Sequence, residues 1–327
     1  MEYRQLGNSN LQLSTITYGA FAIGGNMWGG TEKKEAIASI HAAIDHGVTS
    51  IDTAPFYGFG LSEAMIGEAL AGKDRSNLQL LTKFGLVWDG SNQGRGEYFF
   101  DASHNGHNIP VFKYASPSNI IKEVEESLTR LRTDYIDLLQ IHWPDNSTPI
   151  HETMEALHKL QQQGKIRAAG VSNYSAAQLE EASRTINIAS NQVPYSMLNR
   201  SIENELLPHT LENKIGIIAY SPMERGLLTG KYFQDAKLKE DDHRHGYFGQ
   251  HNLEQVKAFL EAIRPLAESK KASLAQLVLR WTTLQKGITV VLAGARNAEQ
   301  AIANAQSMHI ELTPDELVFI NRELAAI

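Results

Sequence analysis

The 327-residue sequence contains no cysteine. Disulfide bonds, thiolate nucleophiles and cysteine-based zinc or iron–sulfur sites are therefore excluded. An excess of positive charge is also missing, because 30 basic residues stand against 37 acidic ones and the formal net charge is −7. Nucleic-acid binding proteins usually carry a basic surface, and anionic membranes repel an acidic one. We therefore expect neither nucleic acid nor membrane as a partner.

Long apolar runs are absent as well. No stretch approaches the roughly 18 apolar residues that a membrane-spanning helix needs, and Met1–Arg4 lacks the basic-then-apolar layout of a signal peptide. These absences predict a cytoplasmic protein. The dinucleotide-binding motif Gly-x-Gly-x-x-Gly is missing too, since its nearest match, Gly58-Phe59-Gly60, lacks the third glycine. This counts against a Rossmann fold.

Eight short, apolar and β-branched segments alternate with longer helical patterns along the chain. The predicted strands are Ser14–Ala20, Val48–Ala54, Leu78–Phe84, Tyr135–His142, Ile166–Ser172, Ala189–Tyr195, Ile215–Ser221 and Thr289–Ala295. Nearly continuous apolar strands are typical of parallel sheets that are covered on both faces. Eight strands, each followed by a helix, predict a closed (β/α)₈ barrel, the TIM barrel. No linker interrupts the alternation, so we expect a single domain over residues 1–327.

The helical segments carry recognisable start and stop signals. A helix over Thr31–His46 is expected to end at Gly47, and Ser116-Pro117 places a cap and a first-turn proline before another helix. Capping boxes are predicted at Ser175…Gln178, Ser273…Gln276 and Thr313…Glu316. At the N-terminus, Tyr3–Leu6 and Leu11–Leu13 are expected to form a β-hairpin that plugs the lower mouth of the barrel.

Two long segments interrupt the alternation. Residues 88–115 follow the third predicted strand and are rich in glycine, asparagine and aromatic residues, whereas residues 231–250 follow the seventh and are polar. Loops of this length without secondary structure are usually functional or disordered. The loops that follow barrel strands surround the active site, so both are candidate substrate loops at its rim. The alternative is that both are insertions that contact nothing.

Four polar residues lie at or just beyond the ends of neighbouring predicted strands: Asp52, Tyr57, Lys83 and His142. Each alone would more often be structural than catalytic. As a set they suit proton donation to a carbonyl oxygen while hydride arrives at carbon. A lysine ammonium beside the phenol lowers its pKa, and a carboxylate keeps the lysine charged and oriented. The histidine can hydrogen-bond the carbonyl.

These residues and their neighbours resemble the aldo-keto reductase family. Asp52 with Tyr57, Lys83 in Leu81-Thr82-Lys83, and His142 in the stretch 137–144 are similar to the family's catalytic tetrad. Its later signatures are resembled in the same order by residues 170–174, 191–196, 219–223 with 226–231, and 294–297 with Gln300 and Asn304. The resemblance implies reduction of an aldehyde or ketone by NADPH, with Tyr57 as proton donor. The early end of the chain after Thr313–Ala325 is similar to the bacterial and potassium-channel-β branch.

The resemblance also assigns the cofactor contacts. Ser172, Asn173 and Gln192 would hold the nicotinamide carboxamide, with Tyr220 stacked on the ring. Ser221, Met223, Gly226 and Lys231 would line the pyrophosphate path. Arg296, Gln300 and Asn304 would hold the adenosine end, where the Arg296 guanidinium would match the geometry of a 2′-phosphate. The remaining cofactor-binding residues implied are Gly19, Phe21, Asp52, Pro222 and Gly294.

The predicted substrate pocket combines Tyr57 and His142 with Trp28, Trp88 and Trp143. Histidines also gather in the two insertions, but no helical frame supplies a further ligand, so we expect no metal site. Two alternatives stay open: a cofactor-sensing interaction module like the channel β subunits, and a metal-dependent barrel lyase or hydrolase. The physiological substrate and the oligomeric state are not predicted.

Overall fold

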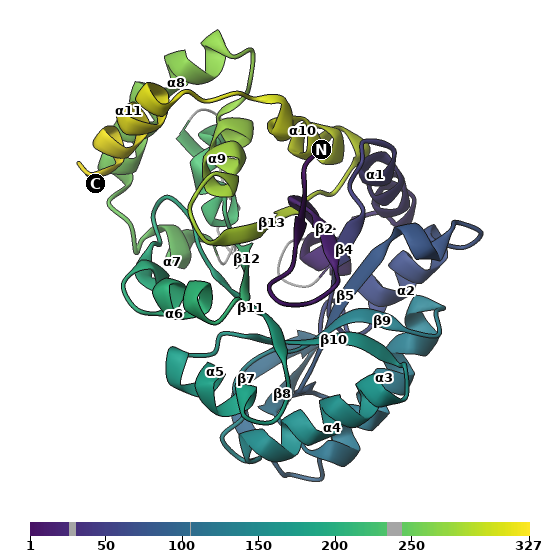
Figure 1. Cartoon of the computed structure of the whole chain (residues 1–327). Coiled ribbons are helices and arrows are strands. Elements are labelled where there is room, and N and C mark those ends of the chain that lie inside the picture. Colours follow the sequence, from purple (N-terminus) through teal and green to yellow (C-terminus); the bar gives the residue numbers. More distant parts are fainter. Residues whose placement is uncertain (26–30, 105, 234–243) are drawn as a thin grey trace.

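The structure is a computed structural model that describes residues 1–25, 31–104, 106–233 and 244–327 (Figure 1). Its centre is a closed barrel of eight parallel strands, hydrogen-bonded in the order β10-β11-β12-β13-β3-β4-β5-β9. The strands are β3 (Ile16–Gly19), β4 (Ser50–Asp52), β5 (Gln79–Phe84), β9 (Ile136–Ile141), β10 (Ile166–Ser172), β11 (Ile188–Pro194), β12 (Gly216–Tyr220) and β13 (Ile288–Gly294). The prediction of an eight-stranded barrel is confirmed.

Helices surround the barrel, as Figure 1 shows. They are α1 (Lys33–Asp45), α2 (Leu61–Ala69), α3 (Pro117–Leu131), α4 (Ile150–Gln162), α5 (Ala176–Ser183), α6 (Leu206–Glu212), α7 (Arg244–Phe248), α8 (Leu253–Ser269), α9 (Leu274–Thr283), α10 (Ala298–Gln306) and α11 (Pro314–Leu324). The cap at Ser116 and the capping boxes of α5, α9 and α11 are present as predicted. Within the described ranges, no helix has both the length and the apolar character that a bilayer crossing requires.

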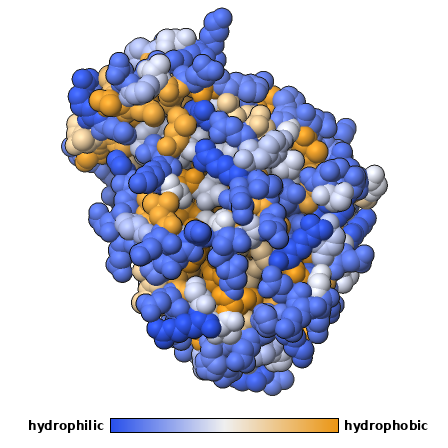
Figure 2. Space-filling model, viewed as in Figure 1, coloured by the Kyte–Doolittle hydropathy of each residue, from blue (hydrophilic) through white to orange (hydrophobic). Residues whose placement is uncertain are grey.

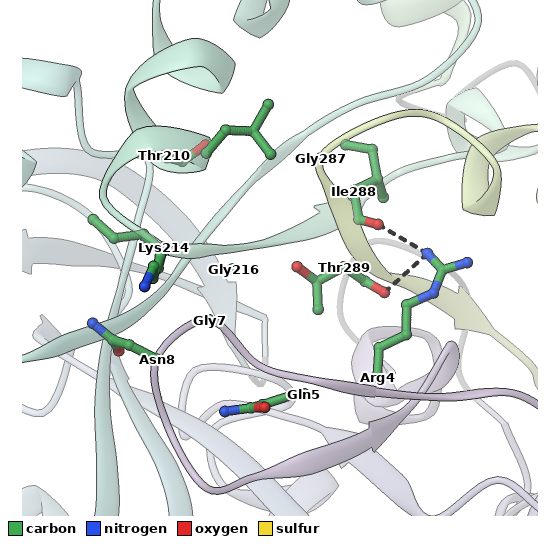
Figure 3. A pocket seen from close by; sticks show the side chains of 12 residues that line it. Arg4, Gln5, Gly7, Asn8, Thr210, Lys214, Gly216, Gly287, Ile288 and Thr289 are labelled. Atoms are coloured by element: carbon green, nitrogen blue, oxygen red, sulfur yellow. Dashed lines mark hydrogen bonds between the residues drawn. The ribbon is translucent and has the colours of Figure 1, made fainter.

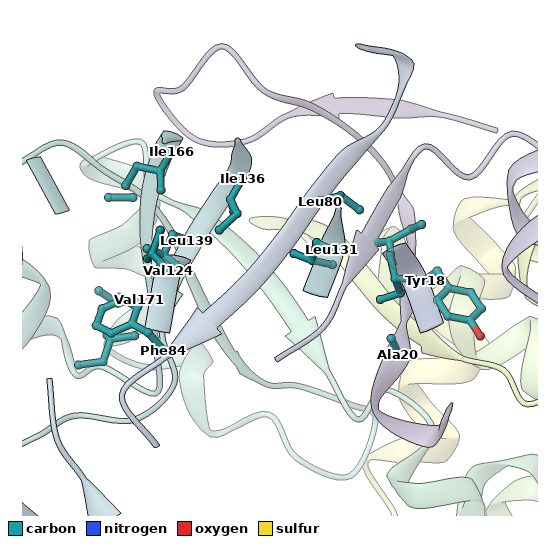
Figure 4. Close-up of a cluster of buried hydrophobic side chains, with 14 of the residues drawn as sticks. Tyr18, Ala20, Leu80, Phe84, Val124, Leu131, Ile136, Leu139, Ile166 and Val171 are labelled. Atoms are coloured by element: carbon teal, nitrogen blue, oxygen red, sulfur yellow. The ribbon is translucent and has the colours of Figure 1, made fainter. Parts of the chain in front are cut away.

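The main core lies between the strands and the helices. Leu80, Leu139 and Val171 point outward from their strands and share a buried cluster with Val124 and Leu131 of α3 (Figure 4). Burial of such side chains stabilises each helix against the barrel by about 1.5–3 kcal/mol per large residue. The outer surface is largely hydrophilic on the face shown in Figure 2, with a group of hydrophobic residues where α8 and α11 lie in Figure 1.

The N-terminal hairpin closes the lower end of the barrel as predicted. It consists of β1 (Tyr3–Gln5) and β2 (Gln12–Ser14), which pair antiparallel. Leu6, Leu11 and Leu13 are buried in one cluster with barrel residues such as Leu138 and Ile218. Figure 3 shows a hollow of about 620 Å³ beside this hairpin, where the Arg4 guanidinium donates hydrogen bonds to the carbonyl oxygens of Ile288 and Thr289.

The first insertion differs from the prediction, because it contains paired β-strands. Within it, β7 (Glu97–His104) and β8 (His107–Lys113) form an antiparallel hairpin, and β8 also pairs with β6 (Leu86–Val87). The missed signal was Asn105-Gly106, a dipeptide strongly favoured in two-residue hairpin turns. In the second insertion, a 3₁₀ turn at Lys231–Phe233 and α7 are seen, and residues 234–243 lie outside the described residues.

Gly7 offers a test of the plug. It has φ +54°, and a Cβ there would lie 2.3 Å from the Ala189 carbonyl oxygen, whereas Gly164 has φ +73° and open space around it. Gly164→Ala should cost about 1–2 kcal/mol of unfolding free energy through left-handed strain alone. Gly7→Ala should cost this plus about 1–3 kcal/mol for the clash. Urea unfolding of both variants measures the difference, and equal losses would contradict the close fit of the hairpin.

Candidate functional site

The barrel brings the four predicted tetrad residues to one rim. Asp52 ends β4, Lys83 lies near the end of β5, His142 follows β9, and Tyr57 lies in the turn after β4. Adjacent strands are in register here, since Asp52 pairs with Leu81 and Lys83 with Gln140. Parallel strands of one barrel end on the same face, where the loops that carry function also lie.

Lys83 and Asp52 form a buried ion pair. The Lys83 Nζ lies 2.6 Å from Asp52 Oδ1, and both side chains are 1% exposed. Nζ also donates to the Thr53 carbonyl oxygen at 2.8 Å, and the other carboxylate oxygen of Asp52 accepts from Gln192 Nε2 at 2.8 Å. Burial is the largest single influence and acts to lower the pKa of Lys83, but the charges and hydrogen bonds of Asp52 and Tyr57 together outweigh it, and the pKa is raised. Lys83 is therefore a cation at neutral pH.

Tyr57 is the partly exposed neighbour of this pair. The Lys83 Nζ lies 4.9 Å from the centroid of its ring, and the Phe21 ring packs edge-on at 4.9 Å. The loss of water around the phenol raises the pKa of Tyr57, and the opposing charge of Lys83 does not offset this rise. The expected lowering of this pKa is wrong for the protein alone, because the prediction counted the ammonium but not the burial. Tyr57 thus keeps its proton at neutral pH.

His142 also packs against the phenol ring. Its ring centroid is 5.7 Å from that of Tyr57, and the two rings meet edge to face. Burial, reinforced by the charge of Lys83, lowers the pKa of His142 well below its ordinary value. A neutral imidazole has one N–H donor and one acceptor nitrogen. The rim therefore offers a phenol and an imidazole, both able to donate to one carbonyl oxygen.

The predicted nicotinamide contacts lie beside the tetrad. Ser172 Oγ donates to the Gln192 carbonyl oxygen at 2.8 Å, and Asn173 Nδ2 donates to the His142 carbonyl oxygen at 3.1 Å. Tyr220 Oη donates to Asn173 Oδ1 at 3.0 Å. These hydrogen bonds join the ends of β9, β10, β11 and β12 into one polar surface next to Tyr57 and His142.

The loop after β12 has an unusual backbone. It carries Ser221, Pro222, Met223, Gly226 and Lys231 of the predicted pyrophosphate path. Five residues in it have positive φ, namely Ser221, Glu224, Arg225, Gly226 and Gly230. Left-handed non-glycine residues cost energy and cluster at functional sites and ligand clamps, and a Cβ at Gly226 would meet nothing within 4 Å. This open, strained backbone fits close approach by a phosphate group.

Sequence reasoning missed the residue that fixes this loop. Glu224 is buried, and its carboxylate accepts hydrogen bonds from Ser196 Oγ and from Tyr247 Oη of α7. The Arg225 guanidinium lies 3.9 Å from the centroid of the Tyr247 ring. No local sequence pattern predicts these contacts, because Glu224 follows β12 and Tyr247 lies in α7, and only the fold brings the two side chains together.

The predicted adenosine contacts follow β13. Arg296 and Gln300 lie around the N-terminus of α10, where Gln300 Oε1 accepts from the Arg296 backbone N–H at 3.0 Å. Asn304 Nδ2 donates to the Gly294 carbonyl oxygen at 3.0 Å. Gly294 is also in register with Gly19 of β3. A helix N-terminus favours anions, so this end fits a phosphate as well.

The predicted substrate pocket includes three tryptophans besides Tyr57 and His142. Trp28 lies outside the described residues. Trp143 packs on Phe99 with ring centroids 5.3 Å apart, and Trp88 packs on Phe56 at 5.8 Å. Sequence reasoning missed Phe56, although its position directly before Tyr57 was a signal. Over the part of the chain that the structure describes, no three histidine, aspartate or glutamate side chains are grouped as metal ligands.

Comparison with known proteins gives a consistent match. A family model described as the Aldo/keto reductase family matches residues 15–322. The chain is 38% identical over 327 residues to "Aldo-keto reductase YhdN" of Bacillus subtilis (strain 168), covering 98% of this chain and 93% of the relative. It is 35% identical over 325 residues to the "NADH-specific methylglyoxal reductase" of Escherichia coli (strain K12), covering 98% and 97%.

The relatives also include the predicted branch, the one of bacterial proteins and potassium-channel β subunits. A "Probable voltage-gated potassium channel subunit beta" of Arabidopsis thaliana is 30% identical over 325 residues, with 95% of this chain and 92% of the relative covered. Among solved structures, the glycerol dehydrogenase AKR11B4 from Gluconobacter oxydans aligns with a TM-score of 0.86 and 37% identity. That alignment covers 99% of this chain and 95% of the other.

The lowered pKa of His142 predicts a pH effect on stability. Below about pH 6.5 the unfolded chain binds a proton at this histidine and the folded protein does not, so folding stability falls as pH falls. His142→Gln removes this loss. The stability advantage of the native protein over the variant should therefore shrink below about pH 6.5, by at most about 1.4 kcal/mol per pH unit. Urea unfolding at several pH values measures it, and a constant difference would contradict a depressed pKa.

Proposed function

The chain belongs to the aldo/keto reductase family, and on this premise we propose that it reduces an aldehyde or ketone to the alcohol with NADPH, Tyr57 donating the proton. The observation that carries the proposal is the buried Lys83–Asp52 ion pair beside a partly exposed phenol and imidazole. The bound nicotinamide supplies the hydride. Tyr57, as the protonated phenol, delivers a proton to the carbonyl oxygen, and neutral His142 donates a second hydrogen bond to that oxygen.

Lys83 acts on the phenol after substrate binding. As the proton leaves Tyr57, negative charge develops on its oxygen, and the ammonium nearby stabilises that charge. Asp52 keeps the ammonium in place and charged. The two buried groups do not need to contact the substrate, because their effect reaches it through the phenol.

The cofactor residues support NADPH as the donor. The polar surface of Ser172, Asn173 and Gln192 suits the carboxamide, and the open backbone at Gly226 suits the pyrophosphate. Arg296 would bind the 2′-phosphate, a group that NADH lacks. A relative that is 35% identical is named as NADH-specific, so the proposed preference for NADPH rests on the Arg296 contact in this chain.

We also propose that residues 1–327 act as one domain, with 88–115 and 231–250 at the active-site rim. The cytoplasmic location and a small-molecule carbonyl partner stay predictions. A second candidate is a nicotinamide-binding subunit with little turnover, which the 30% identity to a channel subunit beta favours. The four tetrad residues, brought together with a charged lysine and a protonated tyrosine, favour turnover instead.

Tyr57→Phe tests the proton donor. The substitution removes only the hydroxyl, so packing against Phe21 and His142 should persist and NADPH should still bind. General acid catalysis contributes about 10²–10⁴-fold, and kcat for carbonyl reduction should fall by that factor. Tyr98→Phe, which makes the same change on an exposed residue, is the control. A Tyr57→Phe protein with near-native kcat would remove Tyr57 from the mechanism.

Arg296→Ala tests the cofactor preference. Loss of a charge-assisted contact with the 2′-phosphate should weaken NADPH binding by about ten- to a hundredfold and leave NADH within about threefold. Titration of intrinsic fluorescence with each cofactor gives both dissociation constants. Arg322→Ala, at an exposed arginine of α11, should change neither. If Arg296→Ala weakened the binding of NADPH and NADH by the same factor, the side chain would not contact the 2′-phosphate.

A further inference from the structure

The β7–β8 hairpin contains a β-bulge at Phe99. Tyr98 pairs with Phe112 and Phe100 pairs with Val111, so Phe99 has no partner on β8. Side chains of a regular strand alternate between its two faces, and a bulge interrupts that alternation. Tyr98 is 55% exposed, while Phe99 and Phe100 are both partly buried in one apolar cluster. The bulge thus turns two consecutive phenylalanines toward the barrel.

These two phenylalanines complete a row of aromatic rings. Phe99 packs on Trp143 at a centroid distance of 5.3 Å, and Phe100 packs on Phe56 at 5.7 Å. Their own rings are 4.9 Å apart. We call Trp143, Phe99, Phe100 and Phe56 the aromatic row. It runs from the residue that follows His142 to the residue that precedes Tyr57.

The aromatic row belongs to a largely apolar cluster. Buried Leu86 and Val111 belong to the same cluster. The Lys113 ammonium lies 5.3 Å from the centroid of Phe99, but it is paired with Glu97 at 2.6 Å. No member of the row carries a charge or a hydrogen-bonding partner for a polar substituent, apart from the indole N–H of Trp143. A flat apolar group would therefore fit against it better than a hydroxylated or charged group.

We propose that the bulge at Phe99 determines substrate specificity, and that the aromatic row receives an aryl substituent of the carbonyl substrate. The inference rests on the proposed function, because that function places the carbonyl between Tyr57 and His142. These two residues are the sequence neighbours of Phe56 and Trp143, which end the row. Aromatic rings attract one another in edge-to-face and offset arrangements beyond simple burial. A strictly alternating strand would present only one of the two phenylalanines and would leave the row open at one end.

A matched pair of substrates tests this assignment. Phenylglyoxal and methylglyoxal carry the same pair of carbonyls and differ in a phenyl or methyl substituent. Apolar contacts of this size discriminate by about 10–200-fold in kcat/KM, so the native protein should favour phenylglyoxal by at least about tenfold. Phe99→Leu and Phe100→Leu keep apolar bulk but remove a ring. Each should lower kcat/KM for phenylglyoxal by about tenfold and leave methylglyoxal within about threefold.

Tyr98→Leu is the control, because it removes a ring from the opposite face of the same strand. It should change neither rate, and circular dichroism of all three variants establishes folding. If the two phenylalanine variants keep the native ratio of rates, or lose both rates equally, the aromatic row does not bind the substituent and the inference is overturned. If the native protein consumes reduced cofactor with neither glyoxal nor any simple aldehyde, the proposed function itself fails, and this is seen before any variant is made.

Discussion

Lys83 and Asp52 are held together inside the barrel, 2.6 Å apart and each 1% exposed. Removing one partner of such a pair typically costs about 3–5 kcal/mol, because the other charge is left buried and unpaired. The pair is supplied with hydrogen bonds from elsewhere in the barrel, by Thr53 and Gln192. Gln192 comes from β11, which is not a neighbour of β4 or β5 in the barrel, so this contact crosses the barrel interior and contributes to both the fold and the site.

The electrostatic state of the rim follows from this pair. The positive charge of Lys83 adds to burial in lowering the pKa of His142, and it opposes burial at Tyr57 without offsetting it. The result is a neutral imidazole beside a protonated phenol, with the ion pair behind them. This arrangement can supply a proton, yet it holds no strong nucleophile, which is the chemistry expected for carbonyl reduction.

Much of the fold could be predicted because its signals are local. The apolar run 135–141 and the cap at Ser116-Pro117 each have their own physical cause, and both appear in the structure as expected. The grouping of Asp52, Tyr57, Lys83 and His142 at one rim could be predicted because parallel strands end on one face, whereas their catalytic roles stay a prediction. The pairing of β7 with β8 was missed because aromatic and glycine residues obscured the alternation, although Asn105-Gly106 marked the turn. The Glu224–Tyr247 contact and the net pKa of Tyr57 could not be predicted, since both depend on which groups the fold buries together.

The reaction proposed for this rim consumes NADPH and a carbonyl compound and uses no metal. The most direct test follows the absorbance of NADPH after a panel of aldehydes is added, with and without a chelator, while the alcohol is quantified. We expect NADPH to be consumed at the same rate in both cases, and one alcohol to form for each NADPH consumed. Binding of NADPH with no consumption by any aldehyde would contradict the proposed reaction and favour a sensing subunit. If the chelator abolished NADPH consumption, the reaction would depend on a metal, and the role assigned to Tyr57 as sole acid would be contradicted.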